Sequence, residues 1–289
     1  MNFFENSPLS KIILEEREFL VKRDDLIDPY LAGNKYRKLY KLLQTPSENL
    51  QTIISYGGTQ SNAMLAIASM CQKKKWQFIY YTKPLSTPLK EQKFGNFYLA
   101  KKLGMHHQEL EEEAYRDKIS ELRLCFDAST YVIDQGGADR GALEGLGVLA
   151  QEIQDSNSSL KALATPSGTG TTALYLAINL PEYKIYTTPC VGDAHYLRKQ
   201  MSALEMIPEN LIILEHTKKY HFAKLYREFF EIYIKTKEAG VEFDLLYAPA
   251  MWLALLEQTD EDIMYIHSGG VSGNESMLRR YSRKNYTNL

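Results

Sequence analysis

Lys35 is the residue in this chain whose type and setting best suit covalent chemistry. It stands in AGNKYRKL (residues 32–39), where a glycine turn comes directly before a predicted helix. A lysine forms a Schiff base with an aldehyde when its amine is partly desolvated and its pKa is lowered. The flanking cations Arg37 and Lys38 favour such a lowering. An ordinary solvated lysine has the same spacing, so this pattern alone leaves both interpretations open.

The second candidate is an anion-binding turn in SGTGTT (residues 167–172). It follows a predicted strand and leads into a predicted helix, whose first backbone amides lack internal partners and carry the positive end of the helix dipole. Its glycines allow close backbone approach, and its hydroxyl side chains add donors. No lysine follows the last glycine, so this is not a Walker A loop, and GxGxxG is absent. A plain strand-to-helix turn fits the spacing equally well.

Two further glycine turns share this setting. YGGTQSNA (residues 56–63) and HSGGVSGNE (residues 267–275) also follow predicted strands and precede helical patterns. In a parallel sheet the carboxyl ends of the strands lie at one edge, where α/β proteins bind their ligands. We therefore expect all of these turns at a ligand-binding edge.

The elements that must position these turns alternate along the chain. Short apolar runs separated by helical patterns predict an α/β fold with parallel sheets flanked by helices. Helices are predicted after Asn62, after Thr171 and from His221 to Lys237, and a long loop over residues 83–92. Strands are predicted at residues 52–56, 77–82, 131–134, 162–165, 184–189, 211–216, 243–248 and 262–267.

Composition narrows the class of protein. The 289 residues, 44% of them hydrophobic, suffice for one large or two medium domains. The balance of 34 basic and 36 acidic residues gives no electrostatic footprint for nucleic acid, and no apolar run reaches the roughly 20 residues of a membrane span. The first residues lack the features of a signal peptide. Cys71, Cys125 and Cys190 lack metal-ligand spacing and suit free thiols. We expect a cytoplasmic enzyme without a metal.

A family resemblance rests on six motifs. VKRDDLIDPYLAGNKYRKL (residues 21–39) resembles the signature of the pyridoxal 5′-phosphate (PLP)-dependent family that contains 1-aminocyclopropane-1-carboxylate (ACC) deaminase and D-cysteine desulfhydrase. The other motifs match that family in the same order, which is far more specific than any single turn. They are SYGGTQSN (residues 55–62), GNFYLAKKLG (95–104), QGGADRGALEGLG (135–147), GTGTTALYLA (168–177) and HSGG (267–270).

The resemblance implies a particular fold. It is the two-domain PLP architecture typified by the tryptophan synthase β chain, known as fold type II. Residues 40–137 would form a smaller α/β domain, and residues 1–39 and 138–289 the larger PLP-binding domain. PLP would bind in the cleft between them, and the protein would be a homodimer.

The resemblance also implies residue roles. Lys35 would carry PLP covalently, and Asn62 would hydrogen-bond the 3′ oxygen of the cofactor. Gln60 and Ser61 would meet the substrate carboxylate, and Ser61 would also take part in proton transfer. For Ser61 a simple helix cap is the alternative. The phosphate would be held by Gly168, Thr169, Gly170, Thr171 and Thr172.

Two tyrosines match the catalytic tyrosines of the family. GVEFDLLYAP (residues 240–249) aligns without a gap with the family's DPVY segment, which places Asp244 and Tyr247 at the matching aspartate and tyrosine. Tyr220, in KKYHF, matches a second family tyrosine. The chain has 20 tyrosines, so core packing is the alternative role for either.

The chain departs from the family at two positions. Ala248 stands where the deaminase has a glutamate and the desulfhydrase a threonine facing the pyridine nitrogen. An acid there keeps that nitrogen protonated and deepens the electron sink, so alanine argues against cyclopropane ring opening. Ser268 is expected near the ring, but a hydroxyl does not hold the nitrogen protonated. Ala63 replaces the family's histidine or glutamine after QSN, which changes the polarity of the pocket.

The resemblance therefore implies a PLP-dependent deaminating enzyme, a lyase or C–N hydrolase, acting on a small amino acid. The leading hypothesis is β-elimination of the D-cysteine type, which releases pyruvate, ammonia and the leaving group. Two alternatives stay open. One is ACC deamination to 2-oxobutanoate and ammonia, and the other is a PLP-binding protein without significant turnover.

Overall fold

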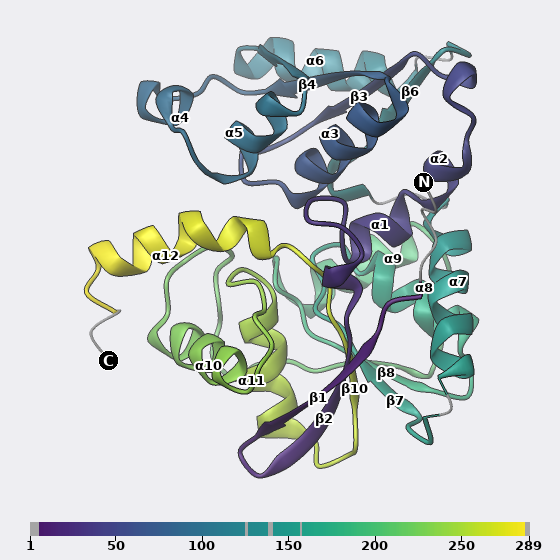
Figure 1. The fold of residues 1–289 in the computed structure, drawn as a ribbon, viewed down its shortest axis with the longest axis vertical. Helices are drawn as coiled ribbons and strands as arrows, with labels where there is room; N and C mark the ends of the chain where they lie inside the picture. The colour runs from purple at the N-terminus through teal and green to yellow at the C-terminus, as the bar shows by residue number, and fades with distance from the viewer. Residues whose placement is uncertain (1–5, 125–126, 138–140, 157, 287–289) are drawn as a thin grey trace.

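The computed structural model describes residues 6–124, 127–137, 141–156 and 158–286. Its strands form two sheets, and helices pack against both of them (Figure 1). The predicted α/β class with parallel sheets flanked by helices is confirmed. Cys125 and residues 138–140, which belong to the QGGADRGALEGLG motif, lie outside the described residues.

A six-stranded sheet forms the lower part of the molecule in Figure 1, in the order β1-β2-β10-β7-β8-β9. β1 pairs with β2 antiparallel, and the other pairings are parallel. Against one face of this sheet Trp252 stacks on Tyr265, with ring centroids 4.4 Å apart. The strands are β1 (Leu9–Leu14), β2 (Arg17–Lys22), β7 (Ala162–Ala164), β8 (Lys184–Thr187), β9 (Leu211–Ile213) and β10 (Met264–Ile266).

A four-stranded parallel sheet forms the upper part, in the order β5-β4-β3-β6. One of its two inner strands, β3, is rich in β-branched residues, and Ile53 in that strand is fully buried. The strands are β3 (Thr52–Tyr56), β4 (Gln77–Thr82), β5 (Met105–Glu109) and β6 (Thr130–Ile133).

The helices divide between the two sheets, and α1 and α12 lie where the two parts meet (Figure 1). α3, α5 and α6 cover the four-stranded sheet, while α7, α8, α10 and α11 pack on the six-stranded one. The helices are α1 (Asn34–Lys38), α2 (Tyr40–Gln44), α3 (Asn62–Lys74), α4 (Thr87–Glu91), α5 (Gly95–Lys102), α6 (Glu112–Arg123), α7 (Ala142–Asp155), α8 (Thr171–Asn179), α9 (Ala194–Ser202), α10 (Arg227–Glu238), α11 (Ala248–Gln258) and α12 (Asn274–Arg283).

The strand predicted at residues 243–248 is wrong. The Asp244 carboxylate accepts hydrogen bonds from the backbone amides of Leu246 and Tyr247, at 2.9 and 2.7 Å, and this side-chain capping turns the chain into α11. Pro249, in the first turn of that helix, fits because its missing amide has no intrahelical partner there. The carboxylate therefore replaces a strand ladder as the partner of these amides.

Other boundaries also differ from the sequence prediction. The helix predicted from His221 begins only at Arg227, because the preceding segment forms a loop. α4 lies within the predicted long loop, and β1, β2 and β5 were not predicted. Cys71 and Cys190 are buried free thiols, as expected. Among the described residues, the helices are all too short or too polar to cross a bilayer.

Candidate active site

A cavity of about 480 Å³ lies between the two sheets, where three glycine turns come together. These turns follow β3, β7 and β10 and lead into α3, α8 and the helical turn before α12, as the sequence predicts. The structure brings to the wall of this cavity Lys35, Gln60, Ser61, Asn62, Gly168, Thr169, Gly170, Thr171, Thr172, Tyr247 and Ser268.

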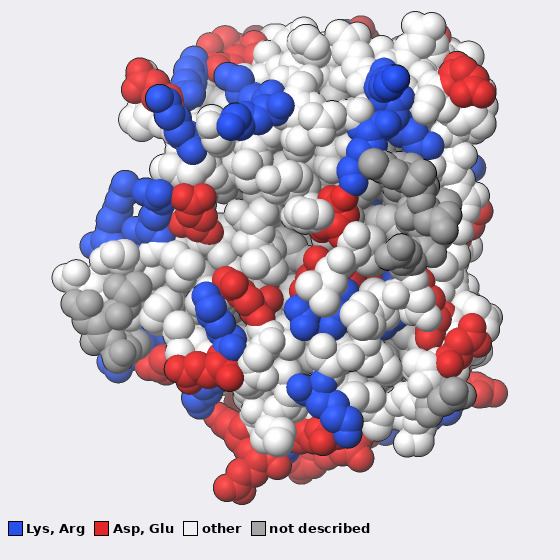
Figure 2. Space-filling model, in the orientation of Figure 1, with Lys and Arg blue, Asp and Glu red and all other residues white. Residues whose placement is uncertain are grey.

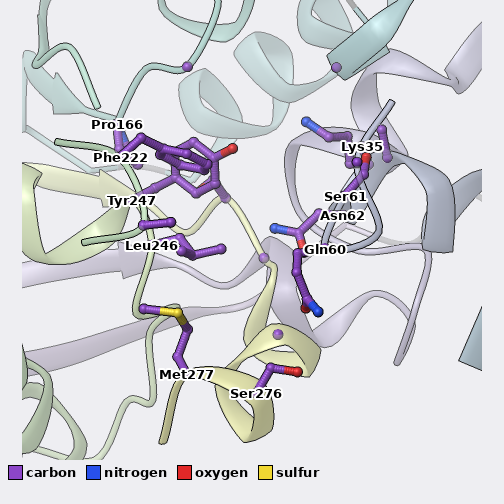
Figure 3. Close-up of a pocket in the computed structure, with 18 of the residues that line it drawn as sticks. Lys35, Gln60, Ser61, Asn62, Pro166, Phe222, Leu246, Tyr247, Ser276 and Met277 are labelled. Carbon is purple, nitrogen blue, oxygen red and sulfur yellow. The ribbon is translucent and has the colours of Figure 1, made fainter. Parts of the chain in front are cut away.

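Lys35 lies on α1, and its side chain lines the cavity (Figure 3). Burial lowers its pKa from 10.5 to about 8, and the negative charge of Asp244 opposes the change only in part. The side chain of Lys38, one turn later, is also buried, and its pKa is lowered by burial and by the charge of Lys35. A substantial fraction of Lys35 is therefore neutral near pH 8, as a nucleophilic amine requires.

Arg37 does not add to this effect, contrary to the expectation for a flanking cation. Its guanidinium is buried and forms ion pairs with Asp24 at 2.7 Å and Glu152 at 2.6 Å. Glu152, on α7, also pairs with Lys22 of β2 at 2.7 Å. The charge of Arg37 is thus neutralised away from the cavity, and the network fixes α1, with Lys35, against the larger sheet.

The amide orientation of Asn62 is set by a neighbour that is not among the predicted site residues. Asn96, at the start of α5, donates from Nδ2 to Asn62 Oδ1 at 2.8 Å, and its own Oδ1 accepts from Ser272 at 3.1 Å. This leaves Asn62 Nδ2 as a donor at the cavity. Asn96 lies in the GNFYLAKKLG motif, so the motif was the available signal for it.

Ser61 caps α3, with its Oγ accepting from the amide of Met64 at 3.2 Å. A hydroxyl that accepts a hydrogen bond keeps its proton for a second partner, so the cap and a role in the cavity are compatible. Gln60 precedes it, and its side chain extends toward Ser276 in Figure 3. Both residues face the cavity at the positive end of α3, which favours a carboxylate.

The loop before α8 has the features of a phosphate site. Gly170, with φ of +77°, is the residue before the first turn of this helix, and the helix amides open toward the cavity. Thr172 Oγ1 is buried and has no hydrogen-bond partner among the described residues. The buried Lys38 amine likewise has no anionic partner there. An unpaired buried donor and an unpaired buried amine, whose charged form an adjacent anion would stabilise, fit a phosphate group, so these residues are compatible with PLP.

One side of the cavity is apolar and carries Tyr247. Figure 3 shows Tyr247 beside Phe222, Leu246 and Met277, facing the polar side that bears Lys35 and Asn62. The ring centroids of Tyr247 and Phe222 are 5.3 Å apart. Burial, with a contribution from the Asp244 charge, raises the pKa of the Tyr247 hydroxyl above its ordinary value. This hydroxyl therefore keeps its proton.

Tyr220 is not brought to the cavity. Its hydroxyl donates to Glu228 at 3.2 Å, and its ring packs on His216, with centroids 4.9 Å apart. Phe222, two residues later in the same loop, lines the cavity instead. Sequence alignment in this loop could not distinguish which aromatic residue turns inward.

The two departures from the family pattern differ in position. Ala63 lines the cavity, whereas Ala248, the first residue of α11, is 1% exposed, lies in the core and does not line the cavity. Neither alanine can donate to or accept from a ring nitrogen.

Ser268 lies in the turn that follows β10. Its carbonyl accepts a hydrogen bond from the Asn34 amide at 3.2 Å, which connects this turn to the turn that carries Lys35.

Known proteins are similar to this chain over nearly its whole length. A protein of Thermotoga maritima named "Putative 1-aminocyclopropane-1-carboxylate deaminase" is 27% identical over 290 residues, which span 90% of this chain and 91% of that protein. D-cysteine desulfhydrase of Serratia proteamaculans is 24% identical and spans 88% and 87%. The resemblance to the ACC deaminase and D-cysteine desulfhydrase family is confirmed. The prediction that the chain is an enzyme is confirmed with it, although no family model matches the sequence.

Solved structures show the same fold. A crystal structure described as an ACC deaminase homologue superimposes with a TM-score of 0.74 at 23% identity, covering 96% of this chain and 94% of that one. Threonine deaminase isoform 2 of Solanum lycopersicum gives 0.64 at 14% identity, covering 97% and 83%. The predicted fold type II architecture of this family is therefore confirmed.

Proposed function

We propose that the protein is a PLP-dependent deaminating lyase that acts on a small amino acid by β-elimination, as in D-cysteine breakdown. The observation that carries this proposal is the Lys35 amine, which has a pKa lowered to about 8 and shares one cavity with an anion-binding loop. An amine of this kind condenses with an aldehyde, and the loop suits a phosphate on the same molecule.

Different residues of the chain would bind different parts of the cofactor. Lys35 Nζ would bind the aldehyde carbon, and Asn62 Nδ2, oriented by Asn96, would donate to the ring oxygen. The backbone of residues 168–172, the Thr172 hydroxyl and the Lys38 ammonium would hold the phosphate. The chemistry that the bound cofactor supplies is an electron sink for the α-carbon of the substrate.

The substrate would be oriented by the start of α3. Ser61 and the backbone amides beside it would bind the α-carboxylate, with Gln60 close by. Lys35 Nζ would take the α proton of the bound substrate, because its neutral form is well populated near pH 8. Ser61 Oγ is the nearby hydroxyl through which that proton could be relayed.

The properties of Tyr247 favour a leaving group that needs no proton. Its pKa is raised by burial, so its hydroxyl is a weak acid for protonating a departing hydroxide. A thiolate departs as the anion, because an ordinary thiol has a pKa of about 8.5. The Cα–H electrons form the new double bond as the Cβ–S pair leaves with sulfur. We therefore expect D-cysteine to react faster than D-serine.

ACC deamination is the second candidate, because relatives at 22 to 27% identity carry that name. Ala248 aligns with the family position that faces the pyridine nitrogen, and the described cavity wall contains no aspartate or glutamate, so this nitrogen would have no acidic partner and the electron sink for opening a cyclopropane ring would be weaker. Release of 2-oxobutanoate from ACC, faster than pyruvate from D-cysteine, would reverse our preference. Binding of PLP without any amino-acid turnover would support the alternative of a binding protein.

The test combines labelling with turnover. Borohydride reduction of the PLP-loaded protein, followed by peptide mass spectrometry, should place the label on Lys35. Pyruvate and ammonia should appear with D-cysteine and should be absent in Lys35→Gln. Lys41→Gln, which changes an exposed lysine on α2, serves as the matched control. A label on another lysine, or pyruvate release by Lys35→Gln, would refute the proposal.

The domain division, the cellular location and the oligomeric state are proposed from the family resemblance. We propose that residues 40–137 form the smaller domain and residues 1–39 with 138–289 the larger one, as a cytoplasmic homodimer. The four-stranded sheet is built within the first segment and the six-stranded sheet from the second, which supports the division. Gel filtration with light scattering would measure the oligomeric state.

A further inference from the structure

The cavity wall has an unbalanced charge. Among its described residues there are five lysines and arginines and no aspartate or glutamate, although the whole chain carries a net charge of −2. Lys35 and Lys38 are accounted for by the cofactor. The other three, Arg279, Arg280 and Arg283, all lie on α12. They exceed what the phosphate and one α-carboxylate require.

These arginines lie at the outer end of the cavity. Lys and Arg side chains gather over α12 at the left of Figure 2, beside the junction of the two parts of the molecule. Arg279 and Arg283 are one helical turn apart, so they lie on the same face of α12. The Arg279 guanidinium also lies 4.1 Å from the ring centre of Phe94, a cavity residue from the four-stranded part.

Ser276 adds a buried donor on the same helix. It is 9% exposed, it lines the cavity, and its Oγ has no hydrogen-bond partner among the described residues. A β-carbon placed on Gly95 would lie 2.6 Å from Ser276 Oγ, 3.2 Å from Gln92 Nε2 and 3.7 Å from Gln60 Oε1. The serine hydroxyl and the two amides therefore converge on one point, with no side chain at residue 95 between them. A buried hydroxyl without a partner is costly unless a ligand completes it.

The ion pair that Arg279 already forms does not cancel this charge. Its partner Glu275, at 2.9 Å, does not line the cavity, and both side chains are more than half exposed. Such a surface pair contributes little free energy and yields readily to a better-placed anion. Arg283 has no ion pair among the described residues, and Arg280 donates to the Ala223 carbonyl at 2.8 Å. Arg279 and Arg283 are thus available to a ligand.

We propose that Gln92, Ser276, Arg279 and Arg283 form an outer subsite that binds a second acidic group on the substrate. This inference rests on the proposed function and extends its substrate class beyond D-cysteine to amino acids whose side chain or leaving group carries a second anionic group. The α-carboxylate would bind at the start of α3, and the second anion would lie toward α12. Gln60, which extends from the first site toward Ser276, connects the two (Figure 3).

Equilibrium binding tests this inference without turnover. The PLP-loaded protein is titrated with aspartate, asparagine, glutamate and glutamine in both D and L forms, and binding is followed by cofactor absorbance and by the shift in Tm. At least one acid should bind about tenfold more tightly than its amide, because the pair differs only in the charge of the terminal group. That preference should fall as salt is raised.

Variants locate the preference. Arg279→Gln and Arg283→Gln should each reduce the acid-to-amide ratio severalfold, and Ser276→Ala should reduce it less. Lys284→Gln removes the same charge from the residue next to Arg283, which does not line the cavity, and should leave the ratio unchanged. Equal binding of acids and amides, or a ratio that survives the double arginine variant, would overturn the subsite.

The outcomes also separate this inference from the proposed function. If amino acids bind and D-cysteine is broken down but acids have no advantage, only the subsite fails. If borohydride does not label Lys35, the proposed function fails first. A labelled protein that binds none of the amino acids tested would overturn the subsite as well.

Discussion

Gly33 and Ser268 are in direct backbone contact. The backbone of Gly33 has a φ of +59°, and a β-carbon built there would lie 2.1 Å from the Ser268 carbonyl oxygen. The next amide, that of Asn34, donates to the same carbonyl at 3.2 Å. The turn that carries Lys35 is therefore pressed against the HSGG turn, and only glycine allows this contact.

Gly33→Ala should consequently disrupt the site as well as the fold. We expect a loss of about 3 kcal/mol or more in the free energy of unfolding, from backbone strain together with the steric clash, and a large loss of PLP binding. Urea unfolding and PLP titration measure the two effects. Gly104→Ala is the control, because Gly104 has a φ of +97° but nothing within 4 Å of its β-carbon position. Equal losses in both variants would show that strain alone is responsible.

The buried Arg37 ion pairs predict a second stability effect. Arg37→Met would leave Asp24 and Glu152 without their shared cation, which should cost about 3 to 5 kcal/mol in the free energy of unfolding. Arg37→Lys keeps the charge but cannot form the two-point contact with Asp24, so it should fall between the wild type and Arg37→Met. A loss below about 1 kcal/mol in Arg37→Met, measured by urea unfolding, would contradict the assignment.

The sequence predicts the chemistry-bearing turns of the site better than its outer wall. Lys35, Asn62 and residues 168–172 stand in motifs with strict glycine and polar patterns, since close backbone approach to a ligand restricts residue type. The arginines of α12 and Phe222 have no such signature. Their position depends on how two distant segments pack, which the spacing of residues along one segment does not reveal.

The errors in the fold have local physical causes. Residues 243–248 have the apolar composition of a strand, but the Asp244 side chain binds the amides that a neighbouring strand would need. β5, with the sequence MHHQE, is a polar edge strand and lacks the apolar run used to recognise the others. Both cases depend on partners outside the segment itself.

Substitutions of Thr172 test its role in cofactor binding separately from its contribution to stability. Its hydroxyl is buried without a partner, so Thr172→Val should change the unfolding free energy of the cofactor-free protein by less than about 1 kcal/mol. The same change should weaken PLP binding about tenfold, because a donor to the phosphate is lost. Thr172→Ser keeps the hydroxyl and should stay close to wild type. A Thr172→Val protein with unaltered PLP affinity would remove the residue from the phosphate site.

Asn96 should act on the cofactor through Asn62. Asn96→Asp replaces the donor facing Asn62 Oδ1 with an acceptor, so the Asn62 amide is expected to rotate and turn its own carbonyl toward the cavity. PLP affinity should fall and the absorption maximum of the bound cofactor should shift. Ser272→Ala removes only the hydrogen bond to Asn96 Oδ1 and should have a smaller effect. An unchanged spectrum in Asn96→Asp would mean that Asn62 does not contact the ring oxygen.

The lowered pKa of Lys35 predicts how PLP capture depends on pH. Covalent capture needs the neutral amine, so its rate in the cofactor-free protein should rise about tenfold per pH unit up to about pH 8 and then level off. For a lysine with the ordinary pKa of 10.5, the capture rate would continue to rise beyond pH 10.

The free energy of unfolding depends on the protonation of the same amine. Because the folded protein holds this proton less tightly than the unfolded chain, the contribution of Lys35 to stability decreases as pH falls from 10.5 to about 8 and is constant below that. Lys35→Met should lack this pH dependence, and stopped-flow absorbance with urea unfolding at several pH values measures both effects. A capture rate still rising at pH 10 would show that the Lys35 amine is solvated.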